Sequence, residues 1–404
     1  MRNPTGAASL RLVARRGRIV TARPLVLALG VLARAGALHA HALWPSATRP
    51  YLAIDPGYPP AADWFRRALE RPPRRFPDAA TWNVVRARAL LLGCADGVAF
   101  TAAERALGPA SGRRRVALYV HAGHPISKAV CFVFDPADSE PRAVVKAMPV
   151  RRYSQRLRDE VEHLAAIRAL VAQEREVAAA LPPAPLFAGN VDDDYVVVED
   201  LDRLVGATGR AERAAALDWL AAFQAASSQA TAPWSERDDA DTLGVIDAAW
   251  LRARPDARAM VLDRTRALLT ELRGAPVPRC AVHGDFWRGN IARTGGQLRI
   301  FDWEWASLHG APMFDLWTYE LAELRVRAAA GDDDFAAPLR DALERVAAEL
   351  SRRSLPTELA PATLPAVLAR LAFRIHRATG FEDRMEKPSA RVMASVEDVL
   401  RNTA

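Results

Sequence analysis

The stretch CAVHGDFWRGNIARTGGQLRIFDWEWASLHGAPMFDLW, residues 280–317, decides the fold of this chain. A short apolar run leads into His283 and Asp285, which are separated by one glycine, and Asn290 follows five residues after Asp285. A pair of glycines then precedes a second apolar run that ends on Asp302. Short apolar runs between Gly- and Asn-rich segments predict strands joined by loops rather than a helix.

Three side chains of this stretch, those of Asp285, Asn290 and Asp302, predict a metal-assisted reaction. A hairpin brings its two ends together, so Asp285, Asn290 and Asp302 are expected to form a compact, oxygen-rich site. Such a site suits Mg²⁺, which binds to a few protein oxygens together with phosphate and water. A further carboxylate within reach of a substrate hydroxyl can accept its proton, which is the arrangement that phosphoryl transfer requires. An Asp or Asn beside glycine, taken singly, is more often a turn residue bonded to its own backbone.

Three pieces of the chain, residues 283–291, 300–304 and 310–316, resemble the aminoglycoside phosphotransferase / choline kinase-like family. They occur in the family's order and at its spacing, which makes the resemblance specific. The family is a branch of the protein-kinase-like fold. The resemblance therefore implies an α+β, two-lobed protein-kinase-like fold, with a small antiparallel-sheet N-lobe, a mainly helical C-lobe and, here, an extra N-terminal segment.

The resemblance also implies a role for each motif residue. Asp285 would be the catalytic base, with Asn290 and Asp302 as the Mg²⁺ ligands. His283 would brace the catalytic loop, and Asp315 would hold that loop from the following helix. From the residues alone, His283 is equally a buried, hydrogen-bonded histidine. The role of Glu304 stays open between an outer support of the site, a direct contact to metal or substrate, and a solvated carboxylate.

Composition places the chain among soluble globular proteins. It has 404 residues, enough for two or three domains, with 50% apolar and 25% charged residues. The net charge of +7 is not gathered into a Lys/Arg run with interleaved aromatics, so no nucleic-acid partner is expected. Cys94, Cys131 and Cys280 show neither metal spacing nor a disulfide framework, which fits a reducing compartment and a cytoplasmic location. The prevalence of Ala and Arg suggests a GC-rich bacterial genome.

Residues 1–110 form a segment of unknown role, and a small separate domain is one interpretation of it. Several arginines precede an apolar run at residues 24–33, and Ala40-His41-Ala42 resembles a signal-peptidase site. A secretory signal is therefore one alternative. The arginine-rich stretch before the apolar run is too long for a typical signal peptide. The apolar run itself is too short to cross a bilayer, so no stable membrane insertion is expected. A segment that binds a membrane surface or a partner protein is another alternative.

Residues 111–200 read as the N-lobe, with strands predicted at 116–120, 129–134 and 143–149. The loop 122–128 is expected to cover phosphates, although Gly123 is its single glycine. Lys146, inside an apolar strand, matches the lysine that reaches the α- and β-phosphates of ATP. A lysine there needs an anionic partner. Lys128 is its rival, and a lysine that extends to the surface is the structural alternative.

One long helix is predicted at residues 153–178, and it carries the acidic partner of that lysine. Glu160 lies one turn before an apolar position and is the preferred partner, whereas Glu162 points elsewhere. Farther on, Glu199 and Leu201 lie in a run that resembles the hinge between the lobes. They complete the predicted ATP-binding set, since the backbone of that hinge would bind adenine.

Residues 201–404 read as the C-lobe with the catalytic loop and the substrate helices. Residues 249–273 are predicted to be mainly helical, and helices are predicted at 211–226, 316–330, 335–353, 361–379 and 389–402. Acidic loops are predicted at 235–241 and 332–334. Such loops could receive a cationic substrate but are more often simply solvated.

The sequence thus predicts an ATP- and Mg²⁺-dependent enzyme that moves a phosphoryl group to a hydroxyl of a small molecule, such as an amino alcohol, a sugar or an aminoglycoside. No residue selects among these acceptors, and the oligomeric state stays open. The alternative is a non-catalytic kinase-like module that binds a nucleotide or a partner. The intact Asp285, Asn290 and Asp302 argue against that alternative, while the atypical phosphate loop and the N-terminal segment favour it.

Overall fold

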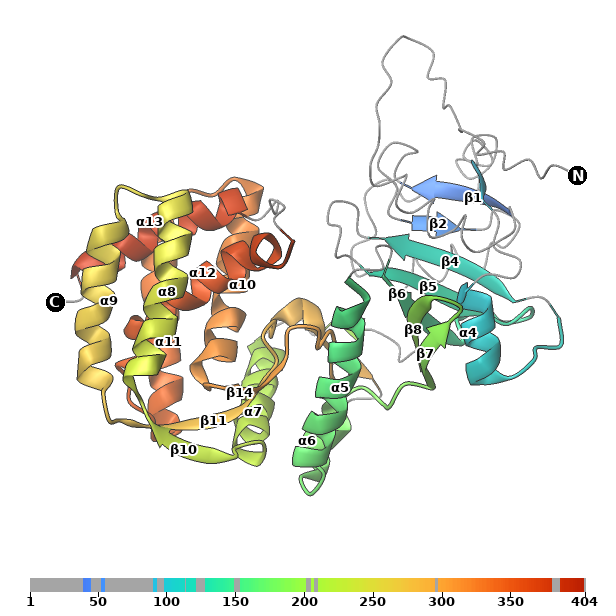
Figure 1. Cartoon of the computed structure of the whole chain (residues 1–404), viewed down its shortest axis with the longest axis horizontal. Helices are drawn as coiled ribbons and strands as arrows, with labels where there is room; N and C mark the ends of the chain where they lie inside the picture. Colours follow the sequence, from blue (N-terminus) through green and yellow to red (C-terminus); the bar gives the residue numbers. More distant parts are fainter. Residues whose placement is uncertain are drawn as a thin grey trace, which may run out of the picture.

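The computed structural model describes a sheet-containing N-lobe and a helical C-lobe side by side (Figure 1). The predicted α+β, two-lobed architecture is confirmed. Among the described residues, no helix is long and apolar enough to cross a membrane. The structure describes residues 39–44, 52–54, 90–92, 98–112, 114–120, 128–148, 153–200, 205–206, 210–294, 297–379 and 386–402.

The N-lobe is built on an antiparallel sheet of eight strands in the order β3-β1-β2-β4-β5-β6-β8-β7. The three strands predicted in this lobe correspond to β4, β5 and β6. Strands from the segment before residue 111 continue the same sheet, because β2 pairs with β4. The strands are β1 (His39–Trp44), β2 (Leu52–Ile54), β3 (Leu90–Leu92), β4 (Arg115–Val120), β5 (Ala129–Phe134), β6 (Ala143–Ala147), β7 (Phe187–Val191) and β8 (Asp194–Asp200).

Two helices cover opposite faces of this sheet, which explains why its central strands are apolar on both sides. Val196 and Val198 of β8 pack with α4 (Val98–Leu107), whereas Val197 packs with α5 (Ser154–Leu170). This is the alternation of period two that a strand imposes. On β6, Val145 belongs to the α4 face, so the next residue, Lys146, points to the α5 face. The sheet geometry therefore aims this lysine at α5.

The C-lobe consists of a helical bundle and two small three-stranded sheets, β10-β11-β14 and β13-β12-β9. Its helices are α7 (Arg210–Ala226), α8 (Glu236–Ala253), α9 (Arg258–Leu272), α10 (Met313–Ala330), α11 (Ala336–Arg352), α12 (Leu359–Thr379) and α13 (Glu386–Asn402). Its strands are β9 (Val205–Gly206), β10 (Ala230–Pro233), β11 (Pro276–Val282), β12 (Ile291–Thr294), β13 (Gln297–Ile300) and β14 (Ser307–Gly310). The predicted hairpin is the β12–β13 pair.

Two predictions about the helices were wrong. The acidic stretch 235–241 is the start of α8 rather than a loop, because Ser235 and Asp238 form a capping box and the acidic first turn suits the positive end of the helix dipole. The single helix predicted at 153–178 is two helices, α5 and α6 (Arg175–Ala180). The break falls at Val171, whose side chain is fully buried and whose N–H caps α5.

Candidate active site

The loop of residues 283–290, which follows β11, is tied to the first turn of α10. Asp315 accepts hydrogen bonds from the backbone N–H of His283 at 2.8 Å and of Gly284 at 2.9 Å. Gly284 has φ +76°, and a Cβ there would lie 2.2 Å from the backbone oxygen of Trp305, so the position admits glycine alone. Asp315 thus occupies the position that the sequence predicts for it, between this loop and the following helix.

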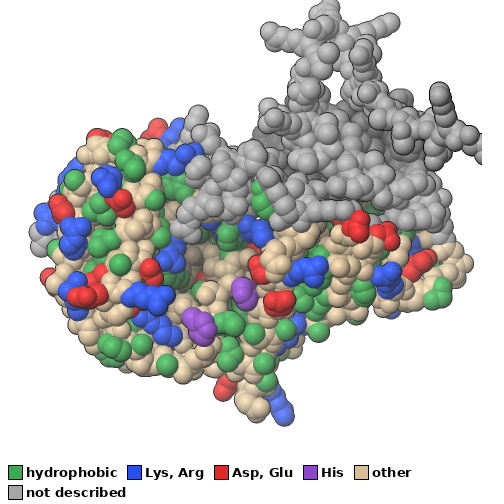
Figure 2. Space-filling view, viewed as in Figure 1, with side chains coloured by type: hydrophobic (Ala, Val, Ile, Leu, Met, Phe, Trp, Pro, Cys, Tyr) green, Lys and Arg blue, Asp and Glu red, His purple; other side chains and the backbone are tan. Residues whose placement is uncertain are grey.

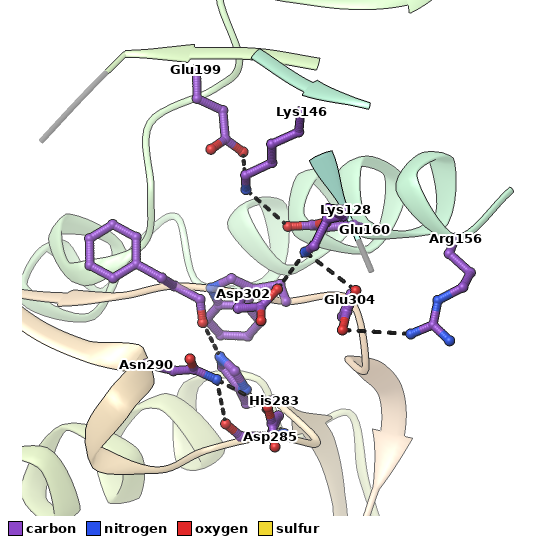
Figure 3. Close-up of polar contacts among 12 residues, drawn as sticks. Lys128, Lys146, Arg156, Glu160, Glu199, His283, Asp285, Asn290, Asp302 and Glu304 are labelled. Carbon is purple, nitrogen blue, oxygen red and sulfur yellow. Dashed lines mark hydrogen bonds and ion pairs between the residues drawn. The ribbon is translucent and has the colours of Figure 1, made fainter. Parts of the chain in front are cut away.

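His283 links the loop to the end of β13. The ring is fully buried, and its Nε2 lies 2.7 Å from the carbonyl oxygen of Phe301 (Figure 3). Since a carbonyl oxygen only accepts, Nε2 carries the proton. Nδ1 then accepts from the backbone N–H of Asp285 at 3.2 Å. Both ring nitrogens are therefore engaged in holding backbone, with the rings of Trp303 and Phe286 at 4.5 and 6.0 Å.

Asp285 and Asn290 of the same loop are hydrogen-bonded to each other. The amide nitrogen of Asn290 donates to the carbonyl oxygen of Asp285 at 2.9 Å and to its carboxylate at 3.2 Å. Both side chains are buried. Because both bonds use the amide nitrogen, the amide oxygen of Asn290 is the atom left to bind a cation.

Asp302 lies two residues after the end of β13 and has φ 63°, in the left-handed region that non-glycine residues seldom adopt. Its carboxylate lies 2.5 Å from the ammonium of Lys128. Burial alone would raise the pKa of Asp302, but the charges of Lys128 and Lys146 hold that pKa well below its usual range. The carboxylate is therefore ionised and already attracts a cation.

The donor set fits a Mg²⁺ ion that is shared with phosphate. Within the described ranges, no group of three or more His, Cys, Asp and Glu side chains is placed to hold a metal. One carboxylate from Asp302 and one amide oxygen from Asn290 are hard ligands, and Mg²⁺ commonly takes one or two carboxylates plus substrate phosphates and water. The contact of Lys128 with Asp302 shows that this carboxylate accommodates a positive charge.

Lys146 and Lys128, the two candidate lysines, converge on one carboxylate. Glu160 lies 3.3 Å from the Lys146 ammonium and 3.1 Å from that of Lys128. Glu160 shares the buried face of α5 with Leu157 and Leu164, whereas Glu162 is exposed. Burial alone would lower the pKa of each lysine, but the neighbouring carboxylates raise both pKa values above the usual one. Both lysines are therefore charged.

The side chain of Glu199 contacts Lys146. It lies on the same face of β8 as Val197, which is the strand partner of Lys146, and its carboxylate is 2.8 Å from the Lys146 ammonium. Leu201, the second predicted hinge residue, lies outside the described residues. Of the predicted phosphate loop 122–128, Lys128 alone is described.

Glu304 belongs to the same charge cluster. Its carboxylate lies 3.3 Å from Lys128 and 3.7 Å from Arg156, and its side chain is 16% exposed (Figure 3). Burial raises the pKa of this carboxyl group. Among the three alternatives that the sequence left open, the solvated carboxylate is thereby excluded. The cluster contains three cations and four carboxylates, which leaves a formal negative charge: Lys128, Lys146, Arg156, Glu160, Glu199, Asp302 and Glu304.

The structure adds a residue that the sequence did not single out. Arg374 of α12 places Nη1 2.6 Å from the Asp285 carboxylate. Its guanidinium also lies 5.0 Å from the ring of Trp305, and Arg156 lies 4.0 Å from that ring. Arg374 comes 89 positions after Asp285, within a helix that carries other arginines, so no motif or spacing marks it.

These residues face one another across the join between the lobes. In the close-up, the lysine–carboxylate cluster lies on one side and Asp285 with Asn290 and His283 on the other (Figure 3). The space-filling view shows Lys and Arg side chains interspersed with Asp and Glu over the described face, without a surface of one sign (Figure 2). The arrangement offers lysines for a polyphosphate, hard ligands for a divalent cation and a carboxylate for a hydroxyl proton.

A sequence model described as "Phosphotransferase enzyme family" matches residues 126–351, more than half of the chain. That range includes the two lysines, Glu160, Glu199 and every residue of the 283–290 loop. No curated protein matches the chain.

The solved structures to which this chain is similar share little sequence with it. A thermostable mutant of the aminoglycoside phosphotransferase APH(4)-Ia, in complex with AMP-PNP and hygromycin B, is 14% identical with a TM-score of 0.45 over 75% of this chain and 98% of that one. A glucosamine kinase in complex with glucosamine, ADP and phosphate is 15% identical, with a TM-score of 0.41 over 70% and 83%. An amicoumacin kinase in complex with AMP-PNP, Ca²⁺ and its ligand is 14% identical, with a TM-score of 0.44 over 71% and 88%.

Proposed function

Because the chain belongs to the phosphotransferase enzyme family, we propose that it transfers the γ-phosphoryl group of ATP, with Mg²⁺, to a hydroxyl group of a small molecule. The observation that carries this proposal is the placing of Asp285 and Asp302 on either side of one buried histidine. The two ring nitrogens of His283 bond the backbone of Asp285 and of Phe301, the residue before Asp302. The proposed base and the proposed metal ligand are therefore held at a fixed separation. Family membership also confirms the predicted resemblance and the predicted enzyme class, a small-molecule kinase.

In the proposed reaction, the N-lobe holds the nucleotide. Lys146 and Lys128 bind phosphate oxygens, and Glu160 keeps both lysines in position. Asp302 and Asn290 would hold Mg²⁺, which supplies positive charge to the phosphates when it is bound. Glu199 and Leu201 belong to the proposed adenine side of the site.

On the C-lobe side, Asp285 orients the acceptor hydroxyl and takes its proton. His283 and Asp315 keep the loop in place without taking part in proton transfer. Positioning and electrostatic stabilisation provide most of the rate enhancement, because phosphoryl transfer asks for little covalent help from the protein.

The proposed acceptor is an amino alcohol, a sugar or an aminoglycoside. Proteins of similar fold bind hygromycin B or glucosamine, which makes such compounds the first to test. The proposed location is the cytoplasm, where ATP is available, with no nucleic-acid partner and no stable membrane insertion.

The test is ADP release from MgATP across a panel of amino alcohols, sugars, aminoglycosides and nucleosides, with wild type beside Asp285→Asn. A compound that stimulates ADP release in the wild type but not in the variant supports the proposal and identifies the acceptor class. Nucleotide binding without stimulation by any acceptor would instead favour a non-catalytic binding module.

A further inference from the structure

Arg374 brings a positive charge to the base from the C-lobe, opposite the two lysines. Its side chain is 20% exposed, and its Nη1 is 2.6 Å from Asp285 Oδ1. Burial alone would lower the pKa of Arg374, but Asp285, Glu304 and Asp302 raise it, so the guanidinium is charged. The face of Trp305 supports the guanidinium at 5.0 Å. The group is therefore both charged and positioned.

Most of the hydrogen-bonding capacity of this guanidinium is not used by Asp285. A guanidinium has five N–H donors in a planar fork, and the Asp285 bond uses Nη1. Within the described part of the chain, Nε of Arg374 is buried and has no hydrogen-bond partner. The guanidinium is nevertheless partly exposed, so donors that Asp285 does not use are available to a ligand.

The position of Asp285 limits where that ligand lies. Asp285 bonds the acceptor hydroxyl in the proposed reaction, and that hydroxyl oxygen is the atom that attacks phosphorus. A guanidinium bonded to the same carboxylate is therefore a neighbour of the phosphoryl group during transfer. Arginine suits this task because its planar fork matches phosphate oxygens.

We propose that Arg374 is a catalytic residue that binds the phosphoryl group as it passes from ATP to the acceptor. The inference rests on the proposed function. In the step, a bond forms between the hydroxyl oxygen and the γ-phosphorus while the bond from that phosphorus to the β–γ bridging oxygen breaks. The electron pair leaves with ADP, and the hydroxyl proton passes to Asp285. Arg374 donates to the phosphoryl oxygens throughout and is not itself consumed.

The experiment measures the affinity for ADP by calorimetry, with Mg²⁺ present, in the absence and presence of aluminium fluoride, which mimics a phosphoryl group in transfer. It requires neither an acceptor nor turnover. In the wild type, aluminium fluoride should tighten ADP binding, and Arg374→Met should lose about ten- to a hundredfold of that tightening, as expected for charge-assisted hydrogen bonds. Arg374→Lys should lose less, because it keeps the charge but not the fork.

The matched control is Arg254→Met, which removes another arginine–carboxylate pair of the C-lobe, with Glu397 at 2.8 Å. This variant should keep the full effect of aluminium fluoride, and thermal unfolding of each variant should show a single transition. If Arg374→Met and Arg374→Lys retain the wild-type tightening, the inference is overturned while the proposed function stands. If the wild type neither binds ADP nor responds to aluminium fluoride, the proposed function fails and the inference with it.

Turnover gives a second readout once an acceptor is found. Arg374→Met should lower kcat about a thousandfold, similar to removal of an arginine that stabilises phosphoryl transfer in other enzymes, with little change in KM for the acceptor. A raised KM for the acceptor at unchanged kcat would mean that Arg374 reads an anionic group of the acceptor instead, and would contradict the inference.

Discussion

The two sides of the site are held in place by different means. On the N-lobe side, charged side chains hold one another, as when Glu160 bridges Lys128 and Lys146. On the C-lobe side, the side chains of His283 and Asp315 accept hydrogen bonds from backbone N–H groups of the loop that carries Asp285. Ion pairs can exchange partners when a polyphosphate arrives, whereas backbone bonds fix geometry. The difference suggests that the N-lobe side binds and that the C-lobe side reacts.

The sharpest test of this contrast is Asp285→Asn, which keeps the shape of the side chain but removes the carboxylate proposed as the base. We expect kcat to fall about a thousandfold or more, with the affinity for ATP nearly unchanged. Steady-state kinetics with calorimetric ATP titration checks both values, and thermal unfolding checks the fold. Wild-type turnover in this variant would remove the role proposed for Asp285.

Asp302→Ala removes the C-lobe carboxylate that contacts Lys128 of the N-lobe. Loss of the carboxylate should abolish the dependence of activity on Mg²⁺ and leave little residual turnover, because the amide of Asn290 alone is a weak ligand set. A Mg²⁺ titration of activity, with Asp332→Ala in an exposed loop as the control, provides the measurement. An unchanged Mg²⁺ midpoint would show that Asp302 is not a ligand.

The lysines should affect binding rather than the chemical step. Lys146→Met should raise KM for ATP about ten- to a hundredfold, because a charged hydrogen-bond donor to phosphate is lost. Lys128→Met should have a similar effect, and the larger of the two identifies the main phosphate lysine. Loss of kcat at constant KM in both variants would contradict the division of tasks between the lobes.

The smallest expected effect concerns pH. Burial alone would raise the pKa of Asp302 in the folded protein. The charge of Lys128 outweighs burial, so the pKa of Asp302 is lowered. A lowered carboxyl pKa contributes stability that is present above the ordinary carboxyl pKa and is lost as pH falls through the folded one. Melting temperatures measured from about pH 5 down to about pH 2, through and below the ordinary carboxyl pKa, should therefore fall less steeply for Asp302→Asn than for wild type. Parallel curves would show that the Lys128 pair adds nothing to stability.

Local pattern was enough to predict much of this architecture. Short apolar runs marked β4, β5 and β6, and helical spacing placed Glu160 rather than Glu162 on the buried face of α5. Asp285 and Asn290 are hydrogen-bonded to each other, and His283 links Asp285 to the backbone of Phe301, next to Asp302. The shared metal-binding role of Asn290 and Asp302 stays a prediction. Each of these inferences depends on residues that are near in sequence or in one secondary structure element.

What the sequence could not predict depends on contacts between distant segments. Arg374 reaches Asp285 through the packing of α12, and no local pattern distinguishes it from other helix arginines. Lys128 and Lys146 could not be ranked because both reach Glu160, Lys146 from β6 and Lys128 from the residue before the neighbouring strand β5. The acidic start of α8 was taken for a loop because charge was given more weight than the capping pair that begins at Ser235.

The left-handed backbone at Asp302 has an evolutionary consequence. A side chain at φ 63° costs on the order of 1 kcal/mol, a cost from which glycine is exempt. Aspartate and glycine codons differ by a single base, so one point mutation at this codon removes the proposed metal ligand and relieves the backbone together. A gene copy released from selection for turnover is therefore one substitution away from a protein without this carboxylate, in which relief of the backbone is offset by loss of the ion pair with Lys128.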